Sequence, residues 1–198
     1  RFAFFRNLCF SILKEYDLSL SRPAPVWLGA SVVCVSFSGA FGAPPALTSL
    51  QSSMEHAGGG GSVSYAIEMP LTDVRGVEPR SGDCVLLFVF DQAVASVGGM
   101  SSSQGTIGGA SGVSGSSPDT VEVHLEGVPD GEWVTVSLTD VLSSGGETQE
   151  SVAGTVGFLM CDVTRNRVVN VSDIRKVATF SGQDVGVGEN FVQDLTKN

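Results

Sequence analysis

The chain has 198 residues, 42% of them hydrophobic, with 11 Lys and Arg against 21 Asp and Glu and a formal net charge of -10. This length suits one or two domains with a buried apolar core. The excess of acidic side chains excludes a nucleic-acid-binding surface, which needs clustered cations to displace the counterions of phosphates, and is compatible with calcium binding.

Residues 1–43 are predicted to be a leader rather than a folded domain. Within it, Arg22 precedes an uncharged run at 26–43 that is rich in small residues, V-W-L-G-A-S-V-V-C-V-S-F-S-G-A-F-G-A. A basic residue, an apolar stretch and small residues at the cleavage site are typical of a secretory signal peptide. A transmembrane anchor is the alternative, but the run is short for one and Pro44 follows it at once. We expect an exported protein, secreted or at the cell surface, without a stable membrane span.

Residues 44–62 and 63–158 differ in composition. The first segment is rich in Pro, Ser and Gly and is predicted to be a flexible linker. In the second, short apolar or alternating runs are separated by Gly, Pro, Asp and Ser, without helical periodicity. This punctuation predicts a β-sandwich of immunoglobulin-like type with about seven strands. The expected strands are 63–69, 84–90, 93–97, 105–113, 120–128, 132–141 and 151–159.

Three of these strands carry specific expectations. The run C-V-L-L-F-V-F at 84–90 is continuously β-branched and aromatic, which is typical of a strand buried on both faces. Because P-D-G at 129–131 is a turn signal, 120–128 and 132–141 are predicted to pair as a hairpin. The alternation in the first of these two strands points three residues inward: Val121, Val123 and Leu125.

No pattern of residues predicts catalysis, and the chain is not expected to be an enzyme. His56, beside the glycines of the predicted linker, and His124, at an outward strand position, lack partners for a triad or a metal cluster. Trp133 is the aromatic candidate for stacking on a sugar, although core packing is the preferred interpretation. A disulfide between Cys84 and Cys161 is possible, but free thiols are preferred.

The segment at 161–173, C-D-V-T-R-N-R-V-V-N-V-S-D, has the oxygen pattern of an EF-hand-like calcium loop. Calcium is a hard cation that takes six to eight oxygen ligands, and such a loop supplies them from positions 1, 3, 5, 7, 9 and 12. Position 7 uses its backbone carbonyl, and position 9 often acts through water. The six candidate ligands of Ca²⁺ are Asp162, Thr164, Asn166, Val168, Asn170 and Asp173.

A second copy of the start of the loop supports this interpretation. The run D-L-T-K-N at 194–198 matches D-V-T-R-N at 162–166 in chemistry, 32 residues later. Such a repeat indicates a duplicated unit, and the sequence ends inside its second copy. The corresponding candidate ligands are Asp194, Thr196 and Asn198. Between the repeats, 172–180 is predicted to be a helix that stops at Gly182. One face of that helix carries Ile174, Val177 and Phe180 or Ala178.

The loop, the helix and the repeat interval together resemble the type I dockerin, over residues 159–198. The preceding V-G-F-L, leading into C-D-V, is similar to the junction between a β-sandwich and a dockerin-like repeat in exported bacterial proteins. The resemblance implies calcium-dependent folding and docking onto a cohesin partner in assemblies for plant polysaccharide breakdown. It also implies that loop positions 10 and 11, Val171 and Ser172, contribute to the choice of partner.

Three features of the loop depart from that pattern. Thr164 offers a neutral hydroxyl where the family has Asn or Asp, and Arg167 occupies position 6, where EF-hands place Gly for a left-handed turn. Only Asp162 and Asp173 contribute carboxylates, with Arg165 close by. We therefore expect a weak affinity, on the order of 10⁻⁴ to 10⁻³ M. The alternative is a metal-free loop in which Asp162 turns the chain and Asp173 caps the helix.

The sequence thus predicts an exported, non-catalytic protein in which a β-sandwich is followed by a dockerin-like attachment module. Two alternatives stay open. One is the C-terminal remnant of a secreted glycoside hydrolase, which residues upstream of Arg1 would reveal. The other is a structural surface or adhesion protein with a vestigial repeat, for which a cohesin pull-down would show no difference between calcium and chelator.

Overall fold

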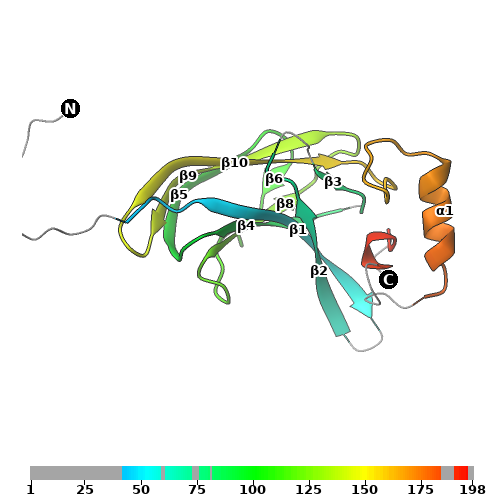
Figure 1. Cartoon of the computed structure of the whole chain (residues 1–198), viewed down its shortest axis with the longest axis horizontal. Coiled ribbons are helices and arrows are strands. Elements are labelled where there is room, and N and C mark those ends of the chain that lie inside the picture. The colour runs from blue at the N-terminus through cyan, green and yellow to red at the C-terminus, as the bar shows by residue number, and fades with distance from the viewer. Residues whose placement is uncertain (1–41, 59–60, 73–75, 81, 184–189, 196–198) are drawn as a thin grey trace, which may run out of the picture. The chain divides into compact units, whose positions relative to one another are not determined.

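A computed structural model describes residues 42–58, 61–72, 76–80, 82–183 and 190–195 (Figure 1). The chain divides into two compact units, Arg1–Gly39 and Ala40–Asn198, and all of the described residues belong to the second. Apart from Gly42 and Ala43, the predicted leader and its signal-like run therefore lie outside the described residues. Among the residues that are described, no helix is long and apolar enough to cross a membrane.

The described residues form two β-sheets. The first sheet has the order β2-β1-β4-β8-β6, with β7 also paired to β8, and the second has the order β3-β10-β9-β5. All of these pairs are antiparallel except that of β3 with β10, which is parallel. The strands are β1 (Leu47–Gly58), β2 (Gly61–Met69), β3 (Gly76–Glu78), β4 (Cys84–Phe90), β5 (Val94–Ser102), β6 (Thr106–Ile107), β7 (Gly112–Val113), β8 (Thr120–Glu126), β9 (Trp133–Ser143) and β10 (Thr148–Phe158).

Alternate residues of both sheets meet in one apolar core. Phe88 of β4, Val123 of β8 and Val136 of β9 are each completely buried in it. A Cβ added to Gly154 of β10 would lie 2.6 Å from Cδ2 of Leu50 in β1, so this glycine allows the two sheets to approach closely. The predicted mostly-β class with two packed sheets is confirmed. So are the inward positions in β8, which are Val121, Val123 and Leu125.

Two of the sequence predictions about this region are wrong. Residues 47–58 of the predicted linker form β1, an interior strand of the first sheet that pairs with β2 and β4. The predicted sandwich therefore begins before residue 63. The predicted hairpin of 120–128 with 132–141 is also wrong, because β8 pairs with β4 while β9 pairs with β10 and β5 in the other sheet. The turn at 129–131 carries the chain from one sheet to the other.

Strand β4 has the predicted bounds but not the predicted burial. Its residues alternate between fully buried and half-buried, so only one face of the strand belongs to the core. Val85 and Leu87 lie on the other face, which points away from the second sheet. The outer face of the first sheet therefore carries partly exposed apolar side chains.

After β10 the chain forms a loop and then the one α-helix of the described residues, α1 (Val171–Phe180). The predicted helix over 172–180 is confirmed, and Gly182 follows its end with a φ of +80°, as a helix-stopping glycine does. Beyond it, a short 3₁₀ helix, η1 (Asn190–Val192), places Val192 in the core. Figure 1 shows α1 and η1 at the end of the unit where β1 ends and β2 begins.

Candidate metal centre

The first loop position, Asp162, is completely buried. Its Oδ1 accepts a hydrogen bond from the backbone N–H of Asn166 at 3.1 Å, and its Oδ2 accepts one from the N–H of Arg167 at 2.6 Å. The carboxylate therefore holds the backbone of residues 166 and 167 in a turn around itself.

The last loop position, Asp173, is 1% exposed and lies in the first turn of α1. It accepts hydrogen bonds from Thr164 N at 3.0 Å, Thr164 Oγ1 at 2.8 Å and Asn170 N at 2.9 Å. Asn170 Oδ1 in turn accepts from Ser172 N at 2.8 Å, which completes a capping box at the start of the helix. Burial raises the pKa of Asp173, but the hydrogen bonds from Asn170 and Thr164 outweigh it and hold the pKa below its ordinary value of 3.8.

The two carboxylates meet at one hydroxyl group. Thr164 Oγ1 lies 3.2 Å from Asp162 Oδ1 and 2.8 Å from Asp173 Oδ1. A hydroxyl has a single proton, so it cannot fully satisfy both acceptors at once. Among the described residues, neither carboxylate forms an ion pair with a cationic side chain. Three oxygens thus converge in a buried place with excess negative charge.

The backbone of the loop has the curvature that position 6 requires. Arg165 has a φ of +58° and Arg167 a φ of +71°, in the left-handed region that favours glycine. The expected conflict at Arg167 is therefore real, because the chain adopts the left-handed turn with an arginine. Cys161, a free thiol just before the loop, also has a positive φ of +73°.

The remaining candidate ligands lie in the same loop. Asn166 Oδ1 accepts from Val168 N at 2.9 Å, and Val168 O accepts from Asn170 Nδ2 at 3.2 Å. With the Asn170 amide at position 9, the candidate donor set is two carboxylates, one hydroxyl, two amide oxygens and one backbone carbonyl, all of them hard oxygen ligands suited to Ca²⁺. Within the described ranges, no three His, Cys, Asp or Glu side chains gather as a metal-binding group, so neutral oxygens must complete such a site.

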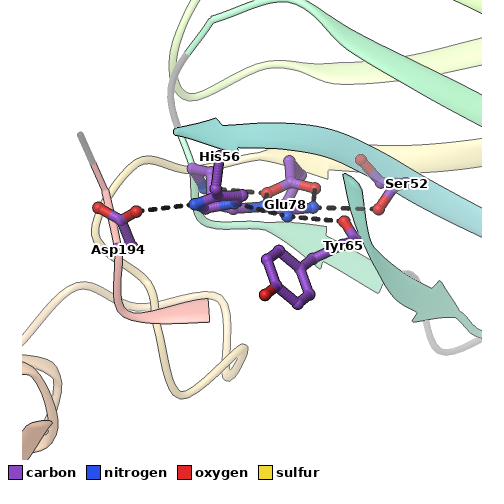
Figure 2. A network of polar contacts seen from close by, with 6 residues as sticks. Ser52, His56, Tyr65, Glu78 and Asp194 are labelled. Carbon is purple, nitrogen blue, oxygen red and sulfur yellow. Dashed lines mark hydrogen bonds and ion pairs between the residues drawn. The ribbon is translucent and has the colours of Figure 1, made fainter. Parts of the chain in front are cut away.

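Asp194, the first residue of the second candidate loop, bonds to a histidine of the sandwich. Thr196 and Asn198 lie outside the described residues, and Asp194 Oδ2 lies 2.8 Å from Nδ1 of His56 in β1. Nε2 of the same imidazole lies 3.2 Å from Nη1 of Arg80, which can only donate. Nε2 must therefore accept, and the ring proton sits on Nδ1, where it is donated to Asp194 (Figure 2). The sequence did not indicate these two partners of His56, which form neither a catalytic triad nor a metal cluster.

Arg80 is the centre of this network. The guanidinium is buried and donates all five of its N–H groups: two to the carboxylate of Glu78, at 2.7 and 2.8 Å, and one to His56. The other two go to the backbone carbonyls of Tyr65 and Ser52. Glu78, also completely buried, supplies the balancing charge.

An aromatic contact adds to the polar network. The Phe191 ring of η1 stacks on Tyr65 of β2, with the ring centroids 4.9 Å apart, and lies 5.8 Å from the guanidinium carbon of Arg80. The segment at 190–195 is thus fastened to the end of the β1–β2 pair by stacking and by the His56–Asp194 bond. No local pattern in the sequence predicts these contacts, because the partners are up to 138 residues apart.

The residues expected to choose a partner lie on the exposed side of the loop and helix. Val171 is 56% exposed, and Ser172 is exposed as well. Ile174, predicted to share an apolar helix face with Val177, is 68% exposed, whereas Val177 packs against the core. The apolar side of α1 is therefore divided between the core and the solvent.

Comparison with known proteins identifies no relative of this chain: no family model, curated protein or solved structure matches it.

Proposed function

We propose that the loop at 162–173 binds Ca²⁺, and that the loop and α1 form a dockerin-like module that attaches an exported, non-catalytic protein to a cohesin-type partner in polysaccharide breakdown. We also propose that the β-sandwich preceding this module is of immunoglobulin-like type. The observation that carries it is the meeting of the buried Asp162 and Asp173 carboxylates at Thr164 Oγ1.

Electrostatics favour a cation at this point. Burial of a carboxylate is costly unless a charge or hydrogen bonds compensate it, and here only N–H and O–H groups do so. A divalent cation between the carboxylates would remove their repulsion, and the Thr164 hydroxyl could then direct a lone pair to the ion. The Asn166 amide oxygen and the Val168 carbonyl would add ligands by exchanging their present hydrogen-bond donors for the ion.

The same hydrogen bonds also describe the alternative, a loop that is complete without metal. The two readings differ in what calcium does, so they are separable by titration. Isothermal calorimetry and far-ultraviolet circular dichroism of the 198-residue chain at up to about 5 mM Ca²⁺ should reveal saturable binding in the millimolar or submillimolar range. Asp173→Asn should weaken it at least tenfold, while the control Glu150→Gln, at an exposed position of β10, should not.

The attachment step requires a separate experiment. A cohesin domain immobilised on beads should retain the chain in calcium and release it in chelator, and Val171→Asp should abolish retention while leaving calcium binding intact. If neither heat nor a spectral change accompanies millimolar calcium, the proposed site is refuted. If calcium binds but the cohesin does not respond, only the proposed partner is refuted.

A further inference from the structure

Charge is divided sharply over the described surface. In the sandwich, residues 42–158, twelve acidic side chains are exposed or half-buried, whereas no described Lys or Arg is, because Arg80 is buried against Glu78. In the loop and helix the opposite holds. Both of its acidic residues, Asp162 and Asp173, are buried, and its four basic residues reach solvent: Arg165, Arg167, Arg175 and Lys176.

The basic side chains of the loop and helix surround exposed apolar ones. Val171, Ile174 and Arg175 follow one another at the spacing that places residues on the same side of a helix. Val171 and Ile174 are more than half exposed, and so is Val168 in the adjoining loop. We call this surface the loop–helix face; it consists of Arg165, Arg167, Val168, Val169, Val171, Ile174 and Arg175. None of its three arginine side chains forms a salt bridge within the described part of the chain.

The sandwich has a groove of complementary character on the outer face of its first sheet. Its floor contains Val85 and Leu87, the half-buried outward residues of β4. Its sides carry Glu55 from β1, Asp83 before β4 and Glu122 from β8, the last directly opposite Leu87 in the strand register. We call this the sheet groove. The sheet groove has apolar side chains between carboxylates, whereas the loop–helix face has apolar side chains between guanidinium groups.

We propose that the loop–helix face of one copy of this chain docks into the sheet groove of a second copy. Val171 and Ile174 would cover Val85 and Leu87, while the arginines approach Glu55 and Glu122. Complementary charge steers such an encounter and sets its orientation, and the apolar contact supplies the burial. The association is head to tail, because the two surfaces differ. Repeated association of this kind produces a linear oligomer.

The loop–helix face has seven residues, fewer than the roughly 20–30 on each side of a standard interface, so the association is weak and sensitive to salt. The proposal uses the face on which the proposed attachment depends, but it does not require calcium. A bound Ca²⁺ would add positive charge to the loop–helix face and tighten the association. An external partner on that face would compete with it.

Sedimentation velocity of the 198-residue chain, from about 10 µM to about 1 mM at low ionic strength, tests the proposal. The average mass should rise with concentration and fall back on addition of about 0.5 M NaCl. Glu122→Arg in the groove and Arg175→Glu on the helix should each raise the dissociation constant at least tenfold. Glu150→Arg, an equal charge change in the other sheet, should alter it less than twofold.

Mixing the two defective variants provides the decisive measurement. A Glu122→Arg chain keeps its loop–helix face and an Arg175→Glu chain keeps its groove, so mixing the two chains should restore an association that neither variant shows alone. Should Glu122→Arg unfold the sheet, as circular dichroism would report, Glu55→Arg at an exposed position takes its place.

A wild-type chain that stays monomeric at all concentrations overturns the proposal. So does an equal effect of Glu150→Arg, or a mixture that forms no dimer. These outcomes are independent of the calcium site. Self-association without any calcium response supports this inference and refutes the proposed loop function. Calcium binding by a strictly monomeric chain supports the loop function and refutes this inference.

Discussion

Replacing Arg80 with methionine keeps most of the length of the side chain but removes its charge and its five hydrogen-bond donors. Glu78, which is completely buried, would then hold a carboxylate without a cation, and Nε2 of His56 would lose its donor. Removing one partner from a buried pair typically costs about 3–5 kcal/mol. Two backbone carbonyls lose donors as well, so we expect the free energy of unfolding to fall by about 4 kcal/mol or more.

Urea denaturation of the 198-residue chain, followed by tryptophan fluorescence and circular dichroism, measures this loss. The informative comparison is a Glu78→Leu/Arg80→Met double variant, which removes both charges. It should be more stable than Arg80→Met alone, because no unpaired charge remains in the core. An Arg80→Met protein that loses less than about 1 kcal/mol would refute the reasoning. So would a double variant that is less stable than the single one.

The metal-free loop should be sensitive to acid. Because the fold lowers the pKa of Asp173, its stabilising contribution is present above about pH 4 and is lost as the pH falls through the lowered pKa; hydrogen exchange of the loop amides should accelerate in that range in the wild type but show no such step in Asp173→Asn. Arg167→Gly should raise the free energy of unfolding of the loop and helix by about 1 kcal/mol, because glycine adopts the positive φ at this position without strain. Arg175→Gly inside α1 should lower the same free energy by a similar amount, because glycine disfavours a helix interior. Equal effects of these two glycines on helix melting would contradict the assignment of strain. Gly157→Val should lower the stability of the sandwich by about 1–3 kcal/mol, since a Cβ there would lie 2.8 Å from the Trp133 ring; an unchanged midpoint in urea would show that the ring moves freely.

The local features of the loop and helix were predictable because their causes are local. Asp173, expected to cap the helix in the metal-free alternative, takes part in a capping box whose N-cap is Asn170, three residues before it, and the stop at Gly182 depends on one backbone angle. Strand β4 was likewise predicted at its true bounds, because its seven residues form one uninterrupted apolar run. In each case the residues that determine the element lie within it.

Pairing between strands could not be read from the sequence in the same way. Alternating residues in β8 and β9 satisfy either a hairpin or two separate sheets, since both arrangements bury the same side chains. In β1 the inward residues include Ser52 and His56, whose polarity concealed a strand within a segment of linker-like composition. His56 is buried only because Arg80 and Asp194, distant in sequence, satisfy both of its ring nitrogens.

The bond between His56 and Asp194 has a consequence for biosynthesis. The two residues are 138 positions apart, so a ribosome releases the histidine long before its carboxylate partner. Until then the nascent sandwich exposes the imidazole, the face of Tyr65 and one side of the Arg80 guanidinium at the end of the β1–β2 pair. Closure of so long a loop is slow, and incompletely covered surfaces promote association of nascent chains. Translation must therefore pass Asp194 before the polar core of this protein is closed to solvent.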